Sequence, residues 1–181
     1  MAKKRCSWCE GDELMVAYHD EEWGFPVRDD AAVFEKLTLE SFQSGLSWRT
    51  ILHKREHFRR AFRGFDLKRV AKFGAKDITR LLGDEGIVRH RGKIEAAIHN
   101  AGCALRVIET EGSMAEFFWN FPGSKAKDGT ALSKELARRD FRFVGPTTVY
   151  AFMQAMGLVN DHAPSCFVRA KAARSQRSLF K

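Results

Sequence analysis

Residues 82–93, LGDEGIVRHRGK, connect two segments whose apolar residues recur at helical spacing. Gly86 and Gly92 bracket the connection, which is typical of a tight turn between two helices. The first backbone N–H groups of the second helix have no acceptor within the helix, and with the helix dipole they form a site for a phosphate group. Three basic side chains would reinforce that site, namely Arg89, Arg91 and Lys93. The stretch therefore predicts a DNA-binding helix-hairpin-helix or, equally well, a plain turn between helices with a basic surface.

Helical spacing continues on both sides of this connection. After it, the apolar residues from Ile94 to Ile108 follow an i, i+3, i+4, i+7 pattern, which predicts one long helix. Further helix starts are marked by Asp29–Asp30, Ser47, Asp66, Asp77, Ser113 and Pro146, and another helix by Leu132 with Leu136. Only Phe141–Val144 alternates like a strand, and it is too short to build a sheet. We expect an all-α domain of roughly eight or more helices, with a polar loop at Gly123–Gly129.

Length and composition bound the class of protein. The chain has 181 residues, which suits one domain, and its 44% hydrophobic residues can form a core. The formal net charge of +8 favours a partner with negative charge, nucleic acid first. No apolar run approaches the ~18 residues of a membrane helix, and the basic N-terminus lacks the apolar stretch of a secretory signal, so we expect a cytoplasmic protein. We divide it into one helical domain at 1–168 and a basic, flexible tail at 169–181.

The positive charge is concentrated in a few stretches. From Lys54 to Lys72 there are eight Lys and Arg residues against two acidic ones. Residues 89–93 and the segment from Arg169 onward carry basic residues and no acid. Such stretches can converge on one face and follow a phosphate backbone. A solvated helix face is nevertheless the commoner role for any one of them.

Two pairs of cysteine and histidine lie near opposite ends of the chain. Cys6 and His19 are close to the N-terminus, and His162 and Cys166 are separated by three residues near the C-terminus. Two thiolates and two imidazoles would form a closed structural zinc centre that ties the two ends together. A competing ligand set uses Cys9, because residues 6–9 read as a CxxC. The alternative is a set of ordinary free thiols and histidines, and spacing alone favours it.

A set of candidate base-binding residues stands in the first fifty residues: Trp8, Tyr18, Trp23, Trp48 and Glu40. The faces of Trp and Tyr rings stack on a nucleobase, and a carboxylate accepts a hydrogen bond from an exocyclic amine. A pocket for a base extruded from a duplex needs both, and a cationic base would gain most from the aromatic faces. The alternative is that the rings are ordinary core aromatics.

Five strings of sequence are more specific than any of these patterns. They are AYHDEEWG (17–24), LESFQSGLSW (39–48), GIVRHRGKI (86–94), FVGPTTVYAFMQAM (143–156) and GLVNDH (157–162). In this order, and over the span from Cys6 to Cys166, they closely resemble the DNA-3-methyladenine glycosylase I family. The resemblance implies a helix-hairpin-helix DNA glycosylase that flips N3-methyladenine out of alkylated double-stranded DNA and hydrolyses its N-glycosidic bond, leaving an abasic site. The non-enzymatic alternative is a protein of the same fold that binds damaged DNA without turnover.

The resemblance also implies the residues of a base pocket. Tyr18 and Trp48 would stack on the flipped base, and Glu40 would bind its edge. Trp8 and Trp23 would form the pocket wall. Some positions depart from the family pattern, with Ser41, Phe42 and Ser44 in place of small or polar residues and Met15 where some members have an aromatic residue. The resemblance implies a monofunctional hydrolase without a nucleotide cofactor, and we expect a monomer.

Contacts to DNA and metal follow from the same resemblance. Gly45 and Leu46 would fill the gap that the flipped base leaves in the duplex. The hairpin residues expected to contact DNA are Gly86, Arg89, Arg91, Gly92 and Lys93. For Lys93, a phosphate contact is expected in preference to the Schiff-base role of lysines in bifunctional glycosylases. The zinc ligands would be Cys6, His19, His162 and Cys166, which decides against Cys9.

Overall fold

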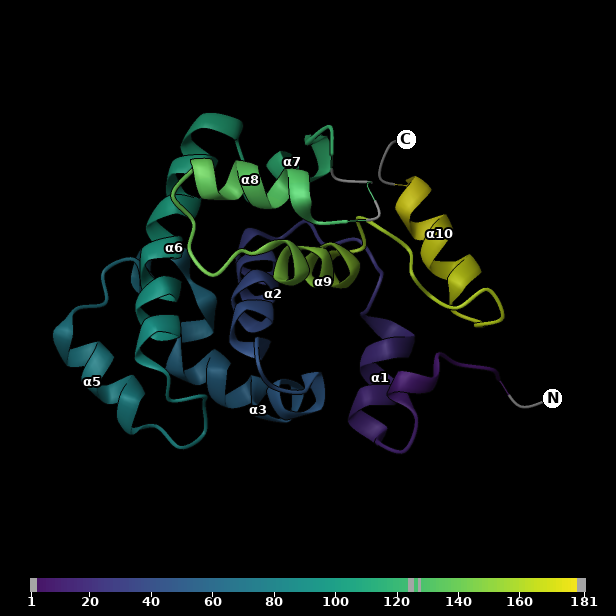
Figure 1. Cartoon of the computed structure of the whole chain (residues 1–181), viewed down its shortest axis with the longest axis horizontal. Helices are drawn as coiled ribbons and strands as arrows, with labels where there is room; N and C mark the ends of the chain where they lie inside the picture. Colours follow the sequence, from purple (N-terminus) through teal and green to yellow (C-terminus); the bar gives the residue numbers. More distant parts are fainter. Residues whose placement is uncertain (1–2, 124–125, 127, 179–181) are drawn as a thin grey trace.

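The computed structural model describes residues 3–123, 126 and 128–178, and all regular structure within them is helical (Figure 1). The 3-10 helices are η1 (Ser7–Cys9) and η2 (Arg63–Phe65). The α-helices are α1 (Glu13–Glu21), α2 (Asp30–Gln43), α3 (Trp48–Ala61), α4 (Leu67–Val70), α5 (Ala75–Gly83), α6 (Arg91–Glu111), α7 (Met114–Asn120), α8 (Thr130–Arg138), α9 (Pro146–Met156) and α10 (Arg169–Ser178). The predicted all-α class is confirmed. Within the described part of the chain, none of these helices combines the length and the apolar character needed to cross a membrane.

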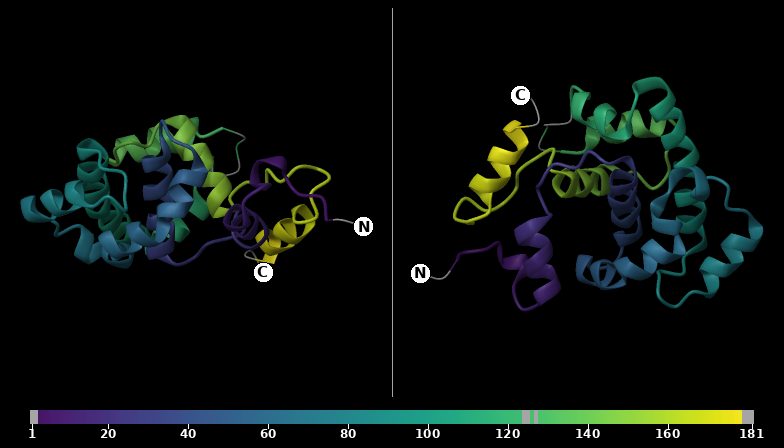
Figure 2. Two further views of the ribbon diagram at one scale, coloured as in Figure 1. Left: turned by 90° about the horizontal axis from the view of Figure 1, so that it is seen from below. Right: turned by 180° about the vertical axis from the view of Figure 1, so that it is seen from behind.

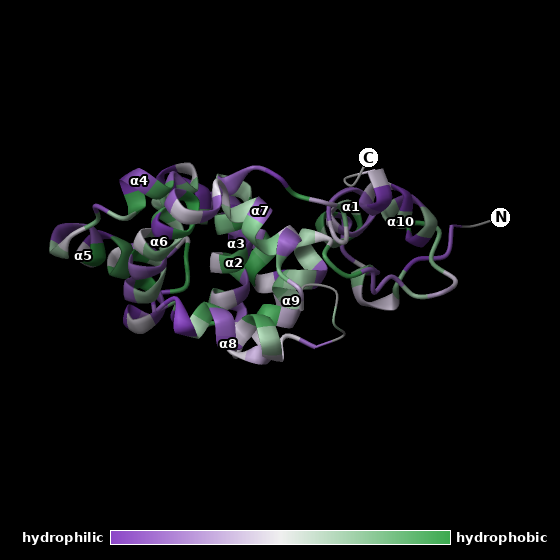
Figure 3. Ribbon diagram, turned by 90° about the horizontal axis from the view of Figure 1, so that it is seen from above, coloured by the Kyte–Doolittle hydropathy of each residue, from purple (hydrophilic) through white to green (hydrophobic). Residues whose placement is uncertain are grey.

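Helix α2 runs through the middle of the molecule, where it packs against α9, α3, α6 and α7. The outer helices α4 and α5 cover one end of this body. At the other end α1 and α10 lie together with both ends of the chain, as two further views show (Figure 2). Apolar residues gather along α2 and α9, whereas α10 is mostly hydrophilic (Figure 3). The molecule thus consists of a helical body and a smaller part in which the N- and C-terminal segments meet.

A cluster of phenylalanine rings fixes α2 against α3 and η2. The ring centroids of Phe42 and Phe58 lie 4.8 Å apart, and the rings of Phe62 and Phe65 stack with centroids 5.6 Å apart. All four side chains are fully buried. Because burial of one such side chain contributes about 1.5 to 3 kcal/mol, this cluster holds the second half of α2 in place.

The predicted helix starts agree with the structure in most cases. The side chains of Asp29, Ser47, Asp66 and Ser113 each accept a hydrogen bond from a backbone N–H three residues later. Asp77 is the exception, because α5 begins two residues earlier. Its carboxylate accepts from the N–H of Gly74 and so stabilises the helix start from inside the first turn.

Helix α1 escaped prediction, because its apolar residues Leu14, Met15 and Val16 are consecutive and show no helical stripe. The strand-like alternation of Phe141–Val144 gives no strand. Asp140 and Phe143 have φ angles of 69° and 55°, a left-handed conformation that breaks an extended chain. Of the predicted loop at Gly123–Gly129, residues 124, 125 and 127 lie outside the described residues.

The segment from residue 169, predicted to be a flexible tail, contains a helix. Residues Arg169–Ser178 form α10, in which Ala172 is fully buried. The side chain of Gln176 donates hydrogen bonds to the carbonyls of Gly157 and Gly24, at 2.8 and 3.3 Å. The basic composition suggested a solvated chain, but one small apolar residue and one amide are enough to attach this helix. Residues 179–181 lie outside the described part of the chain.

Gly157, which ends α9, should tolerate no side chain. Its φ of 80° is left-handed, and a Cβ there would lie 2.6 Å from the carbonyl carbon of Phe25. We expect Gly157→Ala to lower the free energy of unfolding by about 2 to 4 kcal/mol, measured by urea denaturation. Gly102→Ala is the matched control, because that glycine lies inside α6 with open space around it. Gly102→Ala should stabilise the protein by about 0.5 to 1 kcal/mol. Equal effects of the two substitutions would refute the close approach of Gly157 to the backbone of Phe25.

Candidate active site and metal cluster

A pocket of about 790 Å³ opens between the N-terminal segment and the helical body. It is lined by side chains of η1, α1, α2, α3 and α9 and by the segment that follows α9. The lining includes all five residues predicted for a base pocket: Trp8, Tyr18, Trp23, Glu40 and Trp48. The structure therefore brings together side chains that are up to forty residues apart in the sequence.

Glu40 projects from α2 and is 5% exposed. Burial raises the pKa of its carboxyl group to about 8, although the nearby ammonium of Lys36 lowers it in part. The protonated form of Glu40 is therefore favoured at pH 7. A cationic ligand beside the carboxyl group would favour its charged form, because an opposite charge stabilises a carboxylate. The ionisation of the Glu40 carboxyl group therefore depends on the charge of the bound ligand.

The aromatic rings line two sides of this pocket. The ring centroids of Tyr18 and Trp48 lie 5.1 Å apart with their planes tilted by 42°. Trp8 meets Trp23 edge to face at 5.1 Å. The indole Nε1 of Trp48 is buried and has no hydrogen-bond partner within the described residues. A buried N–H without a partner is costly, and an acceptor on a bound ligand would remove that cost.

Two cations stand beside the ring of Tyr18. The Nζ atom of Lys36 lies 5.6 Å and the guanidinium carbon of Arg55 5.9 Å from the ring centroid. Both donate to Glu22, each at 2.6 Å. This network ties α1 to α2 and α3 and so keeps Tyr18 in position against the pocket. It also shows that Arg55, part of the basic stretch 54–72, forms an internal ion pair.

Several polar residues of the pocket lining were not predicted, among them Gln43, Gln154 and Asp161. Gln43 follows Glu40 by three residues on α2, a spacing that places both on one face and could have revealed it. Asp161 lies in the string GLVNDH, where only the histidine was singled out. One carboxylate oxygen of Asp161 accepts from the hydroxyl of Tyr150 at 2.5 Å and from the amide of Gln154 at 2.8 Å.

Of the four departures from the family pattern, only Met15 lines the pocket. Phe42 packs in the phenylalanine cluster of the core. The hydroxyl of Ser41 lies within hydrogen-bond distance of the carbonyls of Leu37 and Phe143. These positions support the shape of α2, so Met15 is the departure that faces a ligand directly.

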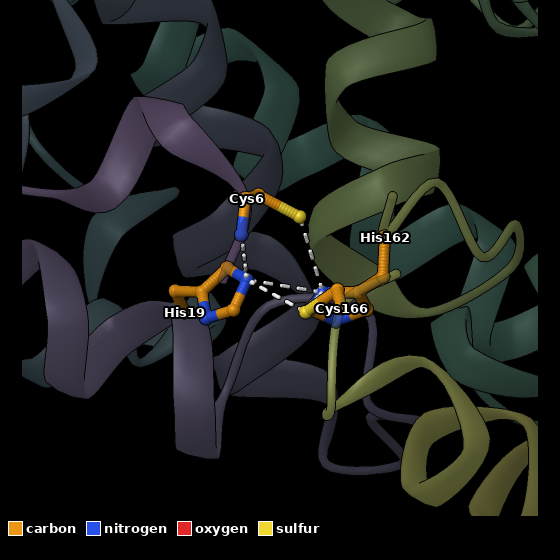
Figure 4. Close-up of side chains that lie close together, drawn as sticks. All are labelled: Cys6, His19, His162 and Cys166. Carbon is orange, nitrogen blue, oxygen red and sulfur yellow. Dashed lines mark hydrogen bonds between the residues drawn. The ribbon is translucent and has the colours of Figure 1, made fainter. Parts of the chain in front are cut away.

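A buried cluster of two cysteines and two histidines lies next to the pocket (Figure 4). It consists of Cys6, His19, His162 and Cys166, whose ligand atoms all lie within 4.8 Å of one another. His19 Nε2 is 3.2 Å from His162 Nδ1 and 3.5 Å from the sulfur of Cys166. The sulfur of Cys6 is 3.8 Å from His162 Nδ1. These are the four predicted ligands, and the cluster could hold a metal ion.

The remaining ring nitrogens in the cluster have partners of their own. His19 Nδ1 lies 2.7 Å from a carboxylate oxygen of Asp20, and His162 Nε2 lies 3.0 Å from the carbonyl oxygen of Trp23. Such outer partners orient an imidazole so that its other nitrogen faces a metal. The thiol of Cys9 donates to the carbonyl of Cys6 at 3.1 Å, and its sulfur is not part of the cluster.

The predicted hairpin connects α5 and α6 through residues 84–90. The side chains of Arg89 and Arg91 are 51% and 62% exposed, with acidic neighbours only on their own segment. His90 caps α6 by accepting from the N–H of Lys93. Gly86 is required by packing, since a Cβ there would lie 2.3 Å from the ring of His57 on α3. Gly92 lies in the first turn of α6, and a Cβ there would lie 3.3 Å from the ring of His90.

Lys93 does not lie where the sequence placed it. The residue is only 7% exposed, and its ammonium donates to the carbonyls of Phe42 and Ser44 at 2.9 and 2.6 Å. A side chain so placed does not extend to the surface for a phosphate contact. Its positive charge lies inside the protein, beside the carbonyls at the C-terminal end of α2.

The segment after α2 is exposed at residues 44–47. Gly45 has a φ of 81°, and Leu46 is one of the few exposed large apolar side chains, at 42% exposure. The N–H of Leu46 donates to the carbonyl of Gln43 at 2.7 Å, which closes a turn directly after the helix. Leu46 is thus an exposed leucine on a hydrogen-bonded turn beside the pocket.

Comparison with known proteins agrees with this geometry. Residues 8–170 match the family model described as methyladenine glycosylase. DNA-3-methyladenine glycosylase 1 of Escherichia coli is 43% identical to the chain, with 90% of this chain and 95% of that protein covered. DNA-3-methyladenine glycosylase of Haemophilus influenzae is 42% identical, with 90% and 96% covered.

Solved structures show the same similarity. A crystal structure of a 3-methyladenine DNA glycosylase I has a TM-score of 0.83 and 44% identity, and covers 91% of this chain and 98% of that one. The enzyme from Staphylococcus aureus, described for its recognition of 3-methyladenine, has a TM-score of 0.85 and 36% identity, with 93% and 98% covered. Fold, sequence and the gathered pocket residues agree, and the chain belongs to the methyladenine glycosylase family.

Proposed function

We propose that this protein is a monofunctional DNA glycosylase that excises N3-methyladenine from alkylated double-stranded DNA and leaves an abasic site. The observation that carries the proposal is the burial of Glu40 in an aromatic pocket beside the projecting Leu46. An aromatic pocket that includes the buried carboxyl group of Glu40 suits a flat, cationic base that has left the duplex. The similarity to named 3-methyladenine glycosylases supports the same substrate.

Cleavage of this N-glycosidic bond needs little catalytic assistance, because the methylated base is already a good leaving group. Methylation at N3 makes the bound adenine positively charged, so it leaves as a neutral base when the N-glycosidic bond breaks. The bonding electrons go to the base nitrogen, while the oxygen of a water molecule bonds to the sugar carbon and loses its proton to solvent. Because the positive charge leaves the base in this step, strong cation–π binding of the intact nucleotide would slow it. Selectivity comes from the shape of the pocket and from hydrogen bonding to Glu40.

Binding to DNA uses two further features. We assign α5, residues 84–90 and α6 to a helix-hairpin-helix motif that holds the backbone through the first turn of α6 and through Arg89 and Arg91. Leu46, carried by the turn at Gly45, fills the space that the flipped base vacates. The expected partner is therefore alkylated duplex DNA. We expect the protein to act as a monomer and without a nucleotide cofactor. Its location in the cytoplasm stays a prediction.

We propose zinc as the ion of the buried cluster. In a tetrahedral site with bonds of about 2.3 Å to sulfur and about 2.0 Å to nitrogen, ligand atoms lie about 3.3 to 3.8 Å apart. Four of the six separations between ligand atoms in the cluster are 3.2 to 3.8 Å and fit that geometry. Two thiolates and two imidazoles complete the coordination, so the ion would stabilise the fold and leave no open position for substrate.

The proposed function is tested by the products released from methylated duplex DNA. Incubation of the protein with DNA treated with a methylating agent should release free 3-methyladenine, identified by chromatography, and leave alkali-sensitive abasic sites. The strands should stay uncleaved before alkali, because a monofunctional enzyme only removes the base. A protein that binds damaged DNA without turnover would release no base, and that result would refute the proposal.

The hairpin arginines should determine part of the salt dependence of DNA binding. Each phosphate contact contributes about 0.9 to the slope of log K against log salt concentration. Arg89→Ala with Arg91→Ala should therefore reduce the slope by about 1.8 on undamaged duplex. Arg138→Ala, a control on α8 with a 70% exposed side chain, should leave it unchanged. An unchanged slope in the double variant would exclude the hairpin from the DNA interface.

A further inference from the structure

The ammonium of Lys93 joins two parts of the proposed DNA-binding surface. Lys93 belongs to the first turn of α6, two residues after the exposed Arg91. Its side chain reaches across to α2 and donates to the carbonyls of Phe42 and Ser44. The last carbonyls of a helix have no partner within the helix, and a cation there also interacts favourably with the helix dipole. Lys93 therefore acts as a cap for α2, supplied from the neighbouring helix.

The end of α2 that Lys93 caps carries functional groups on two sides. Glu40 and Gln43 line the pocket from the last turns of the helix. Directly after them the chain leaves the helix at Ser44, turns at Gly45 and exposes Leu46. The two carbonyls bound by Lys93 thus lie on either side of Gln43, immediately before the projecting turn. Loss of these hydrogen bonds would free the turn without removing any pocket side chain.

We propose that Lys93 is a positioning residue that holds the Gly45–Leu46 turn in its projecting form and links it to the hairpin. The proposal rests on the proposed function, in that the turn is taken to enter the duplex. When the first turn of α6 contacts the backbone, the link through Lys93 sets the place at which Leu46 meets the base stack. Hairpin and turn therefore engage DNA as one rigid unit.

Two other roles for Lys93 fit the structure less well. A phosphate contact needs an exposed ammonium, whereas Lys93 is 7% exposed and donates to the carbonyls of Phe42 and Ser44. A Schiff-base lysine needs to reach the sugar of the flipped nucleotide, and Lys93 is not among the residues that line the pocket. Burial lowers the pKa of the ammonium, which is the ordinary consequence of its place between helices.

The test compares binding of a stable abasic-site analogue with binding of undamaged duplex, because only the analogue offers a gap for Leu46. Lys93→Met should reduce the preference for the analogue about tenfold, close to the effect of Leu46→Ala, since both remove the burial of one leucine side chain. The double variant should be no worse than Leu46→Ala alone, because Lys93 acts through that residue. Binding of free 3-methyladenine, followed by tryptophan fluorescence, should stay within about twofold of wild type.

A matched variant on the same turn separates this role from a phosphate contact. Arg91→Met should lower the salt slope of undamaged-duplex binding by about 0.9, whereas Lys93→Met should leave that slope unchanged. A fall in the slope for Lys93→Met, additive effects with Leu46→Ala, or an unchanged preference for the analogue would each overturn the proposal. So would a borohydride-trapped adduct on abasic DNA that disappears in Lys93→Met.

Two further variants guard against loss of the fold. Lys93→Arg keeps a cationic donor and should retain most of the preference for the analogue, and Lys93→Gln, with a neutral donor, should retain less. Equal behaviour of the two would contradict the cap. Wild-type protein that releases no 3-methyladenine would refute the proposed function, while the binding comparison judges Lys93 by itself.

Discussion

Glu40→Gln should reduce the rate of 3-methyladenine release by about 10²-fold and leave binding to undamaged duplex unchanged. A hydrogen bond to a charged partner contributes about 1.5 to 3 kcal/mol, which corresponds to roughly this factor. Glutamine keeps the size of the side chain but cannot become negative when a cationic base is bound. Single-turnover release from methylated DNA measures the effect, and a rate equal to that of wild type would exclude Glu40 from base recognition.

The same substitution should stabilise the free protein at neutral pH. The pKa of Glu40 is about 8 in the folded protein, against an ordinary value of 4.5. Between these values the folded state binds more protons than the unfolded state, so the free energy of unfolding falls as pH rises. Glu40→Gln removes this loss and should gain about 2 to 4 kcal/mol over wild type at pH 8, with little gain at pH 4.5.

Urea unfolding at several pH values measures this gain. Glu135 provides a control of opposite sign, because hydrogen bonds from Arg138 and Arg139 lower its pKa to about 2. Its contribution to stability is present above pH 4.5 and is lost as pH falls toward about 2, so Glu135→Gln should destabilise the protein at neutral pH. A stability difference between wild type and Glu40→Gln that is the same at pH 5 and pH 8 would show that the carboxyl group does not titrate as the burial implies.

Loss of one ligand of the buried cluster should have the largest effect on stability. Cys166→Ser should abolish bound zinc and lower the melting temperature by about 10 to 20 °C, since a structural zinc site contributes many kcal/mol to folding. The physical reason is that the cluster ties residues 6 and 19 to residues 162 and 166, and so holds the N-terminal segment against the body. Metal analysis and thermal unfolding measure both outcomes.

Cys9→Ser is the matched control for the cluster, because Cys9 lies three residues from a ligand but bonds to a carbonyl. It should keep the metal. Replacement of zinc by cobalt should give the absorption of a tetrahedral thiolate site and leave the rate constant for base release unchanged, because no coordination position is open. A Cys166→Ser variant that contains no metal but is as stable as the wild type would refute the structural role of the metal ion.

The sequence predicted best those features that depend on local pattern or on specific strings. The helix starts at Ser47 and Asp66 could be predicted because one side chain bonds a backbone group three residues away. The pocket and the metal cluster join distant segments, which spacing alone leaves ambiguous with core aromatics and free thiols. There the strings around Tyr18, Glu40 and His162 were decisive, and the structure places Tyr18 and Glu40 in the pocket and His162 in the cluster.

What escaped prediction depends on tertiary contacts. Lys93 looks like part of a basic surface, and only the fold reveals that its side chain turns inward to the end of α2. Residues 169–178 look like a solvated tail, but Ala172 and Gln176 attach them to the body. Arg55 and Arg59 add to the count of positive charge, yet both pair with glutamates of neighbouring helices. Net charge therefore overstates the surface available to DNA.

The central claim is that a flipped N3-methyladenine is excised in the pocket around Glu40. Its most direct test is a single-turnover time course of free 3-methyladenine release from methylated duplex DNA, with wild type and Glu40→Gln compared under enzyme excess. The account predicts release by wild type and release about 10²-fold slower by the variant. Absence of release by folded, metal-loaded wild type, or equal rates for the two proteins, would contradict it.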